Sequence, residues 1–150
     1  MAQFEIGSIS TGTLNPEDLL PTFARELERH APDHALVTAA NDILDRLPDE
    51  WDGGGASELI NDIQDALQNY CPPFVTFGSH PGDGADFGYW PDMERIQETL
   101  TEATMGHTLT LPRNGEWEWT LEDDGVIVNT NDHGNVTVMD LERNVLWAVV

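Results

Sequence analysis

The sequence predicts an α+β fold, in which about four helices in the N-terminal and central parts pack on an antiparallel sheet. Two patterns lead to this prediction. Apolar residues recur at the 3.6-residue helical period in the first two thirds of the chain, and they alternate at the two-residue strand period in the last third. The sheet is expected to consist of a central hairpin and a C-terminal meander. At 150 residues the chain should form a single domain, 1–150, with its own core.

The first helix is expected to begin at Asn15, because asparagine is a preferred N-cap residue and Pro16 and two acids follow it. Its apolar residues are Leu19, Leu20, Phe23 and Leu27. Pro21 lies inside this stripe and could divide the segment into a short turn and a helix from about 21 to 30, because proline lacks a backbone donor. The start of the helix therefore depends on Pro21.

Three more helices are predicted from apolar residues at the helical period. The second ends at Pro48, and its apolar residues are Leu36, Ala40, Ile43, Leu44 and Leu47. The third runs from about Ser57 to Tyr70, and its apolar residues are Leu59, Ile60, Ile63, Ala66 and Leu67. The glycine-rich segment 52–55 between them is expected to be a flexible connection. The fourth runs from Pro91 to about Ala103, and its inward residues are Met93, Ile96, Leu100 and Ala103.

A central β-hairpin is predicted around Pro81-Gly82-Asp83-Gly84, because strand-like segments at 74–79 and 86–90 flank this turn-forming sequence. A β-meander follows in the last third of the chain. Its strands are separated by the turn-forming pairs Asn114-Gly115, Asp124-Gly125, His133-Gly134 and Arg143-Asn144. These turns predict antiparallel neighbours throughout the meander.

One strand of the meander shows a strict alternation. Trp117, Trp119 and Leu121 should form an apolar face. The acids before, between and after them, Glu116, Glu118 and Glu122, should form an acidic face. The alternation predicts that only one side of this strand faces the core.

The charge is the most unusual property of the chain. It has no lysine, and six arginines stand against 28 acids, for a formal net charge of −22. Charged residues make up 23% of the chain, close to the roughly 25% of ordinary proteins, so the sign is unusual and the amount is not. Such a surface repels nucleic acid and anionic membranes and attracts basic proteins. We therefore expect a basic nucleic-acid-binding protein or complex as partner, with no direct nucleic acid and no membrane. The sequence leaves a homodimer open.

Several acids recur at helical spacing, which places them on common helix faces. Like charges at these spacings destabilise a helix by roughly 0.2–0.5 kcal/mol a pair, and no lysine relieves them here. They form either a solvated face or a partner-binding surface. The residues expected to form a partner-binding acidic surface are Asp42, Asp45, Glu58, Asp62, Asp65, Glu94, Glu98 and Glu102.

In composition the chain resembles the virus- and plasmid-borne DNA-mimic inhibitors grouped as anti-CRISPR and antirestriction proteins. These are small, strongly acidic proteins without cysteine frameworks or catalytic motifs. The resemblance implies a protein that occupies the basic groove of a nucleic-acid-binding host protein or complex and inhibits it. Two other interpretations stay open: an immunity protein or antitoxin that neutralises a basic nuclease toxin, and a salt-adapted globular domain of unrelated function.

Candidate chemistry is sparse. The glycine-rich segment 77–90 contains His80, Asp83 and Asp86, which could contact a partner or ligate a cation, although a structural hairpin is favoured. The sequence has no dinucleotide or phosphate-loop fingerprint, no HExxH, no GxSxG and one cysteine, Cys71. We expect no catalytic residues, no cofactor and no metal. A small metal-dependent enzyme is the least favoured alternative.

The N-terminal sequence lacks the basic and apolar regions of a signal peptide. No stretch approaches the roughly 18 apolar residues of a membrane span. A cytoplasmic location is therefore expected, which would be the host cytoplasm for a virus-borne protein.

Overall fold

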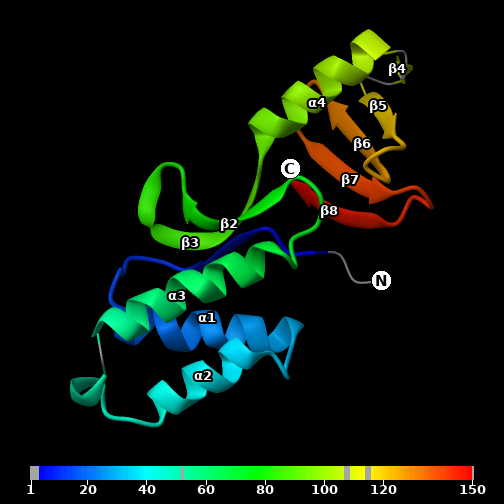
Figure 1. Ribbon diagram of the computed structural model, residues 1–150. Helices are drawn as coiled ribbons and strands as arrows, with labels where there is room; N and C mark the ends of the chain where they lie inside the picture. Colours follow the sequence, from blue (N-terminus) through cyan, green and yellow to red (C-terminus); the bar gives the residue numbers. More distant parts are fainter. Residues whose placement is uncertain (1–3, 52, 107–108, 114–115, 150) are drawn as a thin grey trace. The chain divides into compact units, whose positions relative to one another are not determined.

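The computed structural model describes residues 4–51, 53–106, 109–113 and 116–149 (Figure 1). The chain divides into two compact units. The helical unit comprises Gly7–Cys71 and Thr76–Trp90, and the meander unit comprises Pro72–Val75, Pro91–Val150 and the N-terminal segment up to Ile6. The expectation of one domain over 1–150 stays a prediction.

The helical unit contains three α-helices and a short 3₁₀ turn. The α-helices are α1 (Pro16–His30), α2 (Ala35–Leu44) and α3 (Gly53–Gln68), and the 3₁₀ turn η1 is Pro48–Glu50. α1 packs against both α2 and α3, and α2 also contacts α3. Their fully buried side chains are Leu20, Phe23 and Leu27 on α1, Ala40 on α2, and Ile63 and Leu67 on α3. The apolar faces that the helical period predicted for these helices therefore pack into one core.

α1 is continuous through Pro21, so the suggested division of this segment is wrong. The predicted cap is confirmed, since the Asn15 side chain accepts a hydrogen bond of 3.1 Å from the Glu17 backbone N–H. An interior proline costs a helix about 3 kcal/mol. Complete burial of Leu20 and Phe23 contributes roughly 1.5–3 kcal/mol each, which exceeds that cost.

Two further boundaries differ from expectation. α2 ends at Leu44, and Leu47, which was predicted to be inward, is 68% exposed. The predicted flexible connection is also wrong, because Gly53–Gly55 form the first turn of α3. The first N–H groups of a helix have no intrahelical partner, so glycine costs little there, and the buried Ala56 anchors this turn.

The central hairpin is confirmed. Its strands are β2 (Val75–His80) and β3 (Asp83–Pro91). A strand that the sequence did not predict, β1 (Gly7–Ser10), pairs antiparallel with β3, so the order of this sheet is β1-β3-β2. Gly7 lies opposite Tyr89 and Ser8 opposite Gly88. β3 is therefore the central strand and has a neighbour at each edge.

The meander unit consists of α4 (Met93–Gly106) and five strands. The strands are β4 (Leu109–Arg113), β5 (Glu116–Leu121), β6 (Val126–Asn131), β7 (Val136–Asp140) and β8 (Val145–Val149). They form one antiparallel sheet in the order β4-β5-β6-β7-β8. The α+β prediction is thus confirmed, and the hairpin and the meander lie in two separate sheets. The Asn114-Gly115 turn lies outside the described residues.

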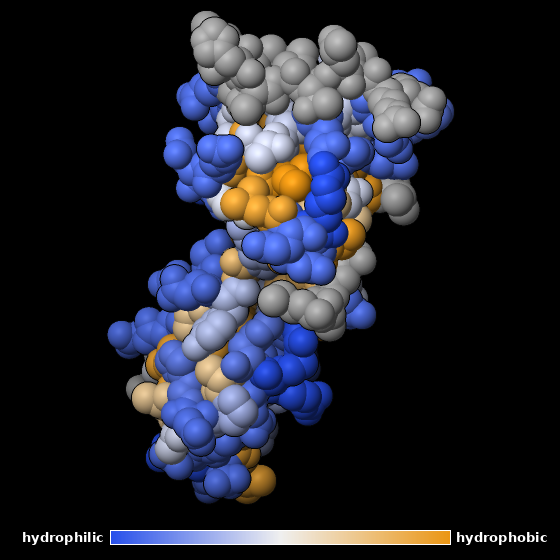
Figure 2. Space-filling model, turned by 90° about the vertical axis from the view of Figure 1, so that its right-hand side faces the viewer, coloured by the Kyte–Doolittle hydropathy of each residue, from blue (hydrophilic) through white to orange (hydrophobic). Residues whose placement is uncertain are grey.

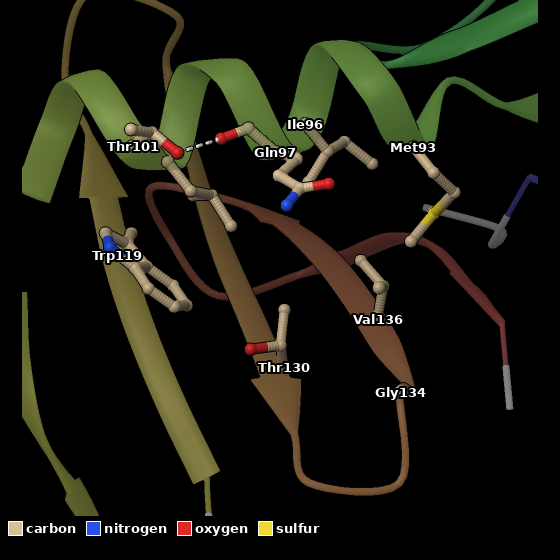
Figure 3. A pocket seen from close by; sticks show the side chains of 9 residues that line it. Met93, Ile96, Gln97, Thr101, Trp119, Thr130, Gly134 and Val136 are labelled. Carbon is tan, nitrogen blue, oxygen red and sulfur yellow. Dashed lines mark hydrogen bonds between the residues drawn. The ribbon is translucent and has the colours of Figure 1, made fainter.

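α4 covers one face of the meander sheet (Figures 1 and 3). Trp117, Trp119 and Leu121 lie on that face, as their alternation predicted, and their register partners on β6 include the buried Val126 and Val128. Burial increases along β5, from Trp117 at 37% exposed to Leu121 at 7%. The sheet is therefore well packed at one end of β5 and open at the other.

In the part of the chain that the structure describes, none of the helices is long and apolar enough to cross a bilayer.

Candidate functional site

The five predicted acids of the helical unit are all exposed. Asp42 lies on α2 and Asp45 is its C-cap residue. Glu58, Asp62 and Asp65 lie on α3, which packs against α2. None of the five side-chain carboxylates forms a hydrogen bond or an ion pair with another described residue. These carboxylates are available to an external cation.

The three predicted acids of the meander unit form a row on α4. Glu94, Glu98 and Glu102 are exposed and stand four residues apart. At a rise of 1.5 Å per residue they are spaced about 6 Å apart along the axis and span about 12 Å. They border a shallow groove of about 530 Å³, to which Gln97 and Thr101 also contribute. We call these three residues the α4 acidic row.

None of the ion pairs found among the described residues involves the eight predicted acids. Arg29 pairs with Glu26, and the Arg143 guanidinium lies 2.8 Å from Glu118 Oε1. Arg95 is on α4 itself, but its guanidinium lies 6.0 Å from the centroid of the Phe74 ring and makes no ion pair with the α4 acidic row. Arg95 is therefore not an ion-pair partner of the row.

A pocket of about 370 Å³ lies between α4 and the meander sheet (Figure 3). The residues that line it are Met93, Ile96, Gln97, Leu100 and Thr101 from α4, and Trp119, Thr130, Gly134 and Val136 from the sheet side. Most of this lining is apolar. Gln97 and Thr101 are the polar residues that α4 contributes to the lining, and the Thr101 hydroxyl donates to the Gln97 backbone carbonyl at 2.7 Å.

The α4 pocket has the size and character of a binding site. Its volume falls within the range of about 300–1,000 Å³ typical of small-ligand sites, and apolar lining with a few polar groups is also typical. Figure 2 shows an apolar patch on the meander unit bordered by hydrophilic surface. The sequence predicted that Met93, Ile96 and Leu100 face inward, but it did not predict the pocket. Met93 is in fact 45% exposed at its mouth.

The hairpin residues hold their own turn. His80 Nδ1 accepts a hydrogen bond of 2.9 Å from the Gly82 N–H, and Asp83 Oδ1 accepts one of 3.0 Å from the Ala85 N–H. Asp86 Oδ1 is buried without a hydrogen-bond partner among the described residues. The three side chains do not converge, and no group of three potential metal ligands is found within the described ranges. A role for them in partner contact stays a prediction.

A polar cluster that the sequence did not reveal joins α1 to β3. The Tyr89 hydroxyl donates to Glu26 Oε1 at 2.7 Å, and Arg29 pairs with the same carboxylate. His30 Nε2 lies 3.2 Å from the Tyr89 hydroxyl and 3.5 Å from Glu26 Oε1. The His30 ring stacks on Tyr70 with 5.4 Å between the ring centroids.

Burial and charge shift the pKa values in this cluster. Burial lowers the pKa of His30, the positive charge of Arg29 lowers it further, and Glu26 only partly opposes them. Burial alone would raise the pKa of Glu26, but hydrogen bonds from Arg29 and Tyr89 outweigh it, so that pKa lies below its ordinary value. Burial, with the hydrogen bond to Glu26, raises the pKa of Tyr89. At neutral pH the cluster therefore holds a carboxylate, a neutral phenol and a neutral imidazole.

We expect the His30→Gln variant to lose less stability than the wild type when the pH falls from 7 to 5. The unfolded chain binds a proton at His30 near pH 6.5, whereas the folded chain binds it only at lower pH, so acidification favours unfolding. The depressed pKa of Glu26 adds a second loss below about pH 4.5 in both proteins. Urea unfolding at several pH values measures the free energy of unfolding of both proteins. Protonation of the other acids reduces their repulsion equally in both, so it cancels in the difference between them. Equal pH slopes for the two proteins would contradict the assigned shift.

Cys71 is poorly suited to nucleophilic chemistry. Burial raises the pKa of its thiol to about 12, and its Sγ lies 3.6 Å from the Leu67 carbonyl oxygen. The thiolate is the reactive form of cysteine, and at this pKa almost none is present at neutral pH.

No family model, curated protein or solved structure matches this chain. The candidate features are therefore defined by their own geometry. The helical unit has exposed carboxylates on α2 and α3, and the meander unit has exposed carboxylates on α4 and an apolar pocket beside them.

Proposed function

We propose that this protein acts by binding rather than by catalysis, as a DNA mimic whose acidic helix faces occupy the cationic groove of a nucleic-acid-binding protein or complex and inhibit it. This is the mode of the anti-CRISPR and antirestriction inhibitors, and it would operate in the cytoplasm. One observation supports it above the others. Eight exposed carboxylates on or at the ends of α2, α3 and α4 have no hydrogen-bond or ion-pair partner among the described residues.

Unpaired carboxylates suit this task because they lose no internal partner when they bind. Hydrogen bonds between carboxylates and arginine or lysine are shorter and stronger than neutral ones. The net charge of −22 also steers a basic partner toward the protein before contact. Along α4 the charges stand about 6 Å apart, against about 3.4 Å of axis per phosphate on one DNA strand. A single helix therefore reaches roughly half the charge density of a strand.

The proposal predicts that binding depends on these eight carboxylates. The probe is the pool of proteins from the native host that duplex DNA retains, applied to the immobilised full chain. Changing all eight to the matching amides takes the formal net charge from −22 to −14. If each exposed pair contributes about 0.35 kcal/mol, the captured partner should bind on the order of 100-fold less tightly. Duplex DNA should displace it from the wild type.

A matched variant distinguishes a binding face from net charge alone. It changes eight other exposed acids to amides and gives the same net charge. These are Glu5, Glu28, Asp33, Asp49, Glu50, Glu122, Asp123 and Glu142. This variant should keep most of the affinity. Equal loss in both variants, or a captured partner that DNA does not displace, would refute DNA mimicry. A captured nuclease toxin would identify the immunity class of the same chemistry.

Folding at low salt separates this proposal from salt adaptation. A salt-adapted domain needs molar salt to fold, because salt ions screen the repulsion between its carboxylates. At 0.1 M ionic strength this repulsion still acts over about 10 Å, and at lower salt it acts further. We expect the circular dichroism spectrum and the thermal midpoint to show a folded protein at 0.05 M KCl. Unfolding there, with recovery in 2 M KCl, would favour the salt-adapted domain.

A further inference from the structure

We propose that the α4 pocket and the α4 acidic row form one binding surface, and that its occupant is a short basic segment of the partner protein whose apolar anchor side chain enters the pocket. This inference rests on the proposed function and adds the local chemistry of the partner. It concerns only the meander unit.

The geometry of α4 makes the two features neighbours. Successive residues of an α-helix are 100° apart, so Ile96 and Leu100 point toward the sheet, and Gln97 and Thr101 lie next around the axis. The α4 acidic row follows directly beyond them. Gln97 and Thr101 line both the pocket and the groove beside the carboxylates, which shows that the two are contiguous.

The pocket suits one bulky apolar side chain. Ile96, Leu100 and Val136 supply aliphatic walls and Trp119 supplies an aromatic one. Such an anchor, desolvated at the centre of an interface, usually contributes more affinity than the exposed charges around it. An acidic surface alone attracts any cation, so the pocket would give the interaction its specificity.

The charges beside the pocket select the occupant. An anionic ligand such as a fatty acid would bring its carboxylate against the α4 acidic row, and a second copy of this chain would bring a net charge of −22. A basic segment is instead attracted. The row spans about 12 Å, which an extended chain covers in about four residues at roughly 3.3 Å each. A segment with basic side chains on both sides of one anchor residue is therefore long enough to reach all three carboxylates of the row, whereas a single cation is not.

The test uses three fluorescein-labelled peptides and the full-length protein. The first peptide has four arginines around a central phenylalanine, the second has serine in place of the phenylalanine, and the third keeps the phenylalanine but has glutamine in place of each arginine. By fluorescence anisotropy we expect the first to bind about tenfold more tightly than the second. The third should not bind at the same concentrations. The methyl NMR signals of Ile96 and Leu100 should shift with the first peptide only.

Two variants assign each part of the effect. Thr101→Trp places a bulky side chain at the exposed rim of the pocket and should abolish the preference for phenylalanine over serine. Converting the α4 acidic row to glutamines should weaken both arginine peptides equally and keep that preference. The matched control converts Glu116, Glu122 and Glu142 to glutamines and removes the same charge elsewhere in this unit.

The outcomes separate the inference from the proposed function. If the two arginine peptides bind equally to the wild type and depend on the α4 acidic row, the pocket inference is overturned while charge-based mimicry stands. If the neutral phenylalanine peptide binds as tightly as the basic one, the single-surface inference is likewise overturned. If the variant of the α4 acidic row binds the arginine peptides as tightly as its matched control does, these carboxylates do not form a binding surface, and the proposed function fails for α4.

Discussion

Replacing Trp147 by alanine is expected to lower the free energy of unfolding of the meander unit by about 4 kcal/mol, within the range for removing a buried aromatic side chain. Trp147 is 0% exposed on β8 and lies opposite Val138, which is also 0% exposed. Its Nε1–H donates to the Pro73 carbonyl at 2.8 Å. The substitution therefore leaves both a cavity and an acceptor without its donor.

Urea unfolding with circular dichroism measures this loss, and two variants divide it. Trp147→Phe keeps most of the apolar volume but removes the donor, so it should cost on the order of 1–2 kcal/mol. Trp117→Ala removes a tryptophan that is 37% exposed on β5 and should cost less than Trp147→Ala, because it removes less buried surface and no side-chain hydrogen bond to another described residue. If Trp147→Ala costs no more than Trp117→Ala, β8 does not pack as described.

Replacing Gly88 by alanine is expected to destabilise the helical unit by about 3 kcal/mol, at the upper end of the range for overpacking. A Cβ atom at this position would lie 2.2 Å from the Gly7 carbonyl oxygen and 2.7 Å from Ser8 Cα. Both are backbone atoms of β1, so they cannot rotate away as a side chain would. β1 must separate from β3, which removes a neighbour from the central strand of this sheet.

Gly84→Ala is the matched control for this prediction. Gly84 is on the same strand, β3, and a Cβ there would meet nothing within 4 Å. Its effect should stay within about 0.5 kcal/mol. Hydrogen exchange adds a local readout, since the backbone amides that join β1 and β3 should lose protection in Gly88→Ala alone. Equal stability of the two variants would show that β1 does not lie against Gly88.

The candidate surfaces differ in how far the sequence could define them. The exposure of the eight acids could be predicted. Their helical spacing places them on common helix faces, and a face of carboxylates is rarely buried without partners. Their lack of ion pairs was harder to predict, since Arg95 is close enough in sequence to pair with Glu98 and is instead placed over Phe74. The α4 pocket could not be predicted, because its lining comes from α4 and from sheet residues that follow Thr101 by 18 or more positions.

The sequence by itself determined the elements that local patterns encode. The Asn15 cap, the central hairpin, the turns after Leu121, Asn131 and Asp140, and the two faces of β5 all follow from neighbours within a few residues. The acidic character of the surface also follows from composition alone.

The tertiary structure decided whatever depends on contacts between distant segments. Burial on α1 keeps the helix continuous through Pro21, β1 is a strand because β3 lies beside it, and Tyr89 reaches Glu26 across 63 residues. The physical reason is that a periodic pattern specifies which side of an element is apolar but not which surface covers it. That choice is made by packing, and packing also leaves the α4 pocket open next to a row of exposed carboxylates.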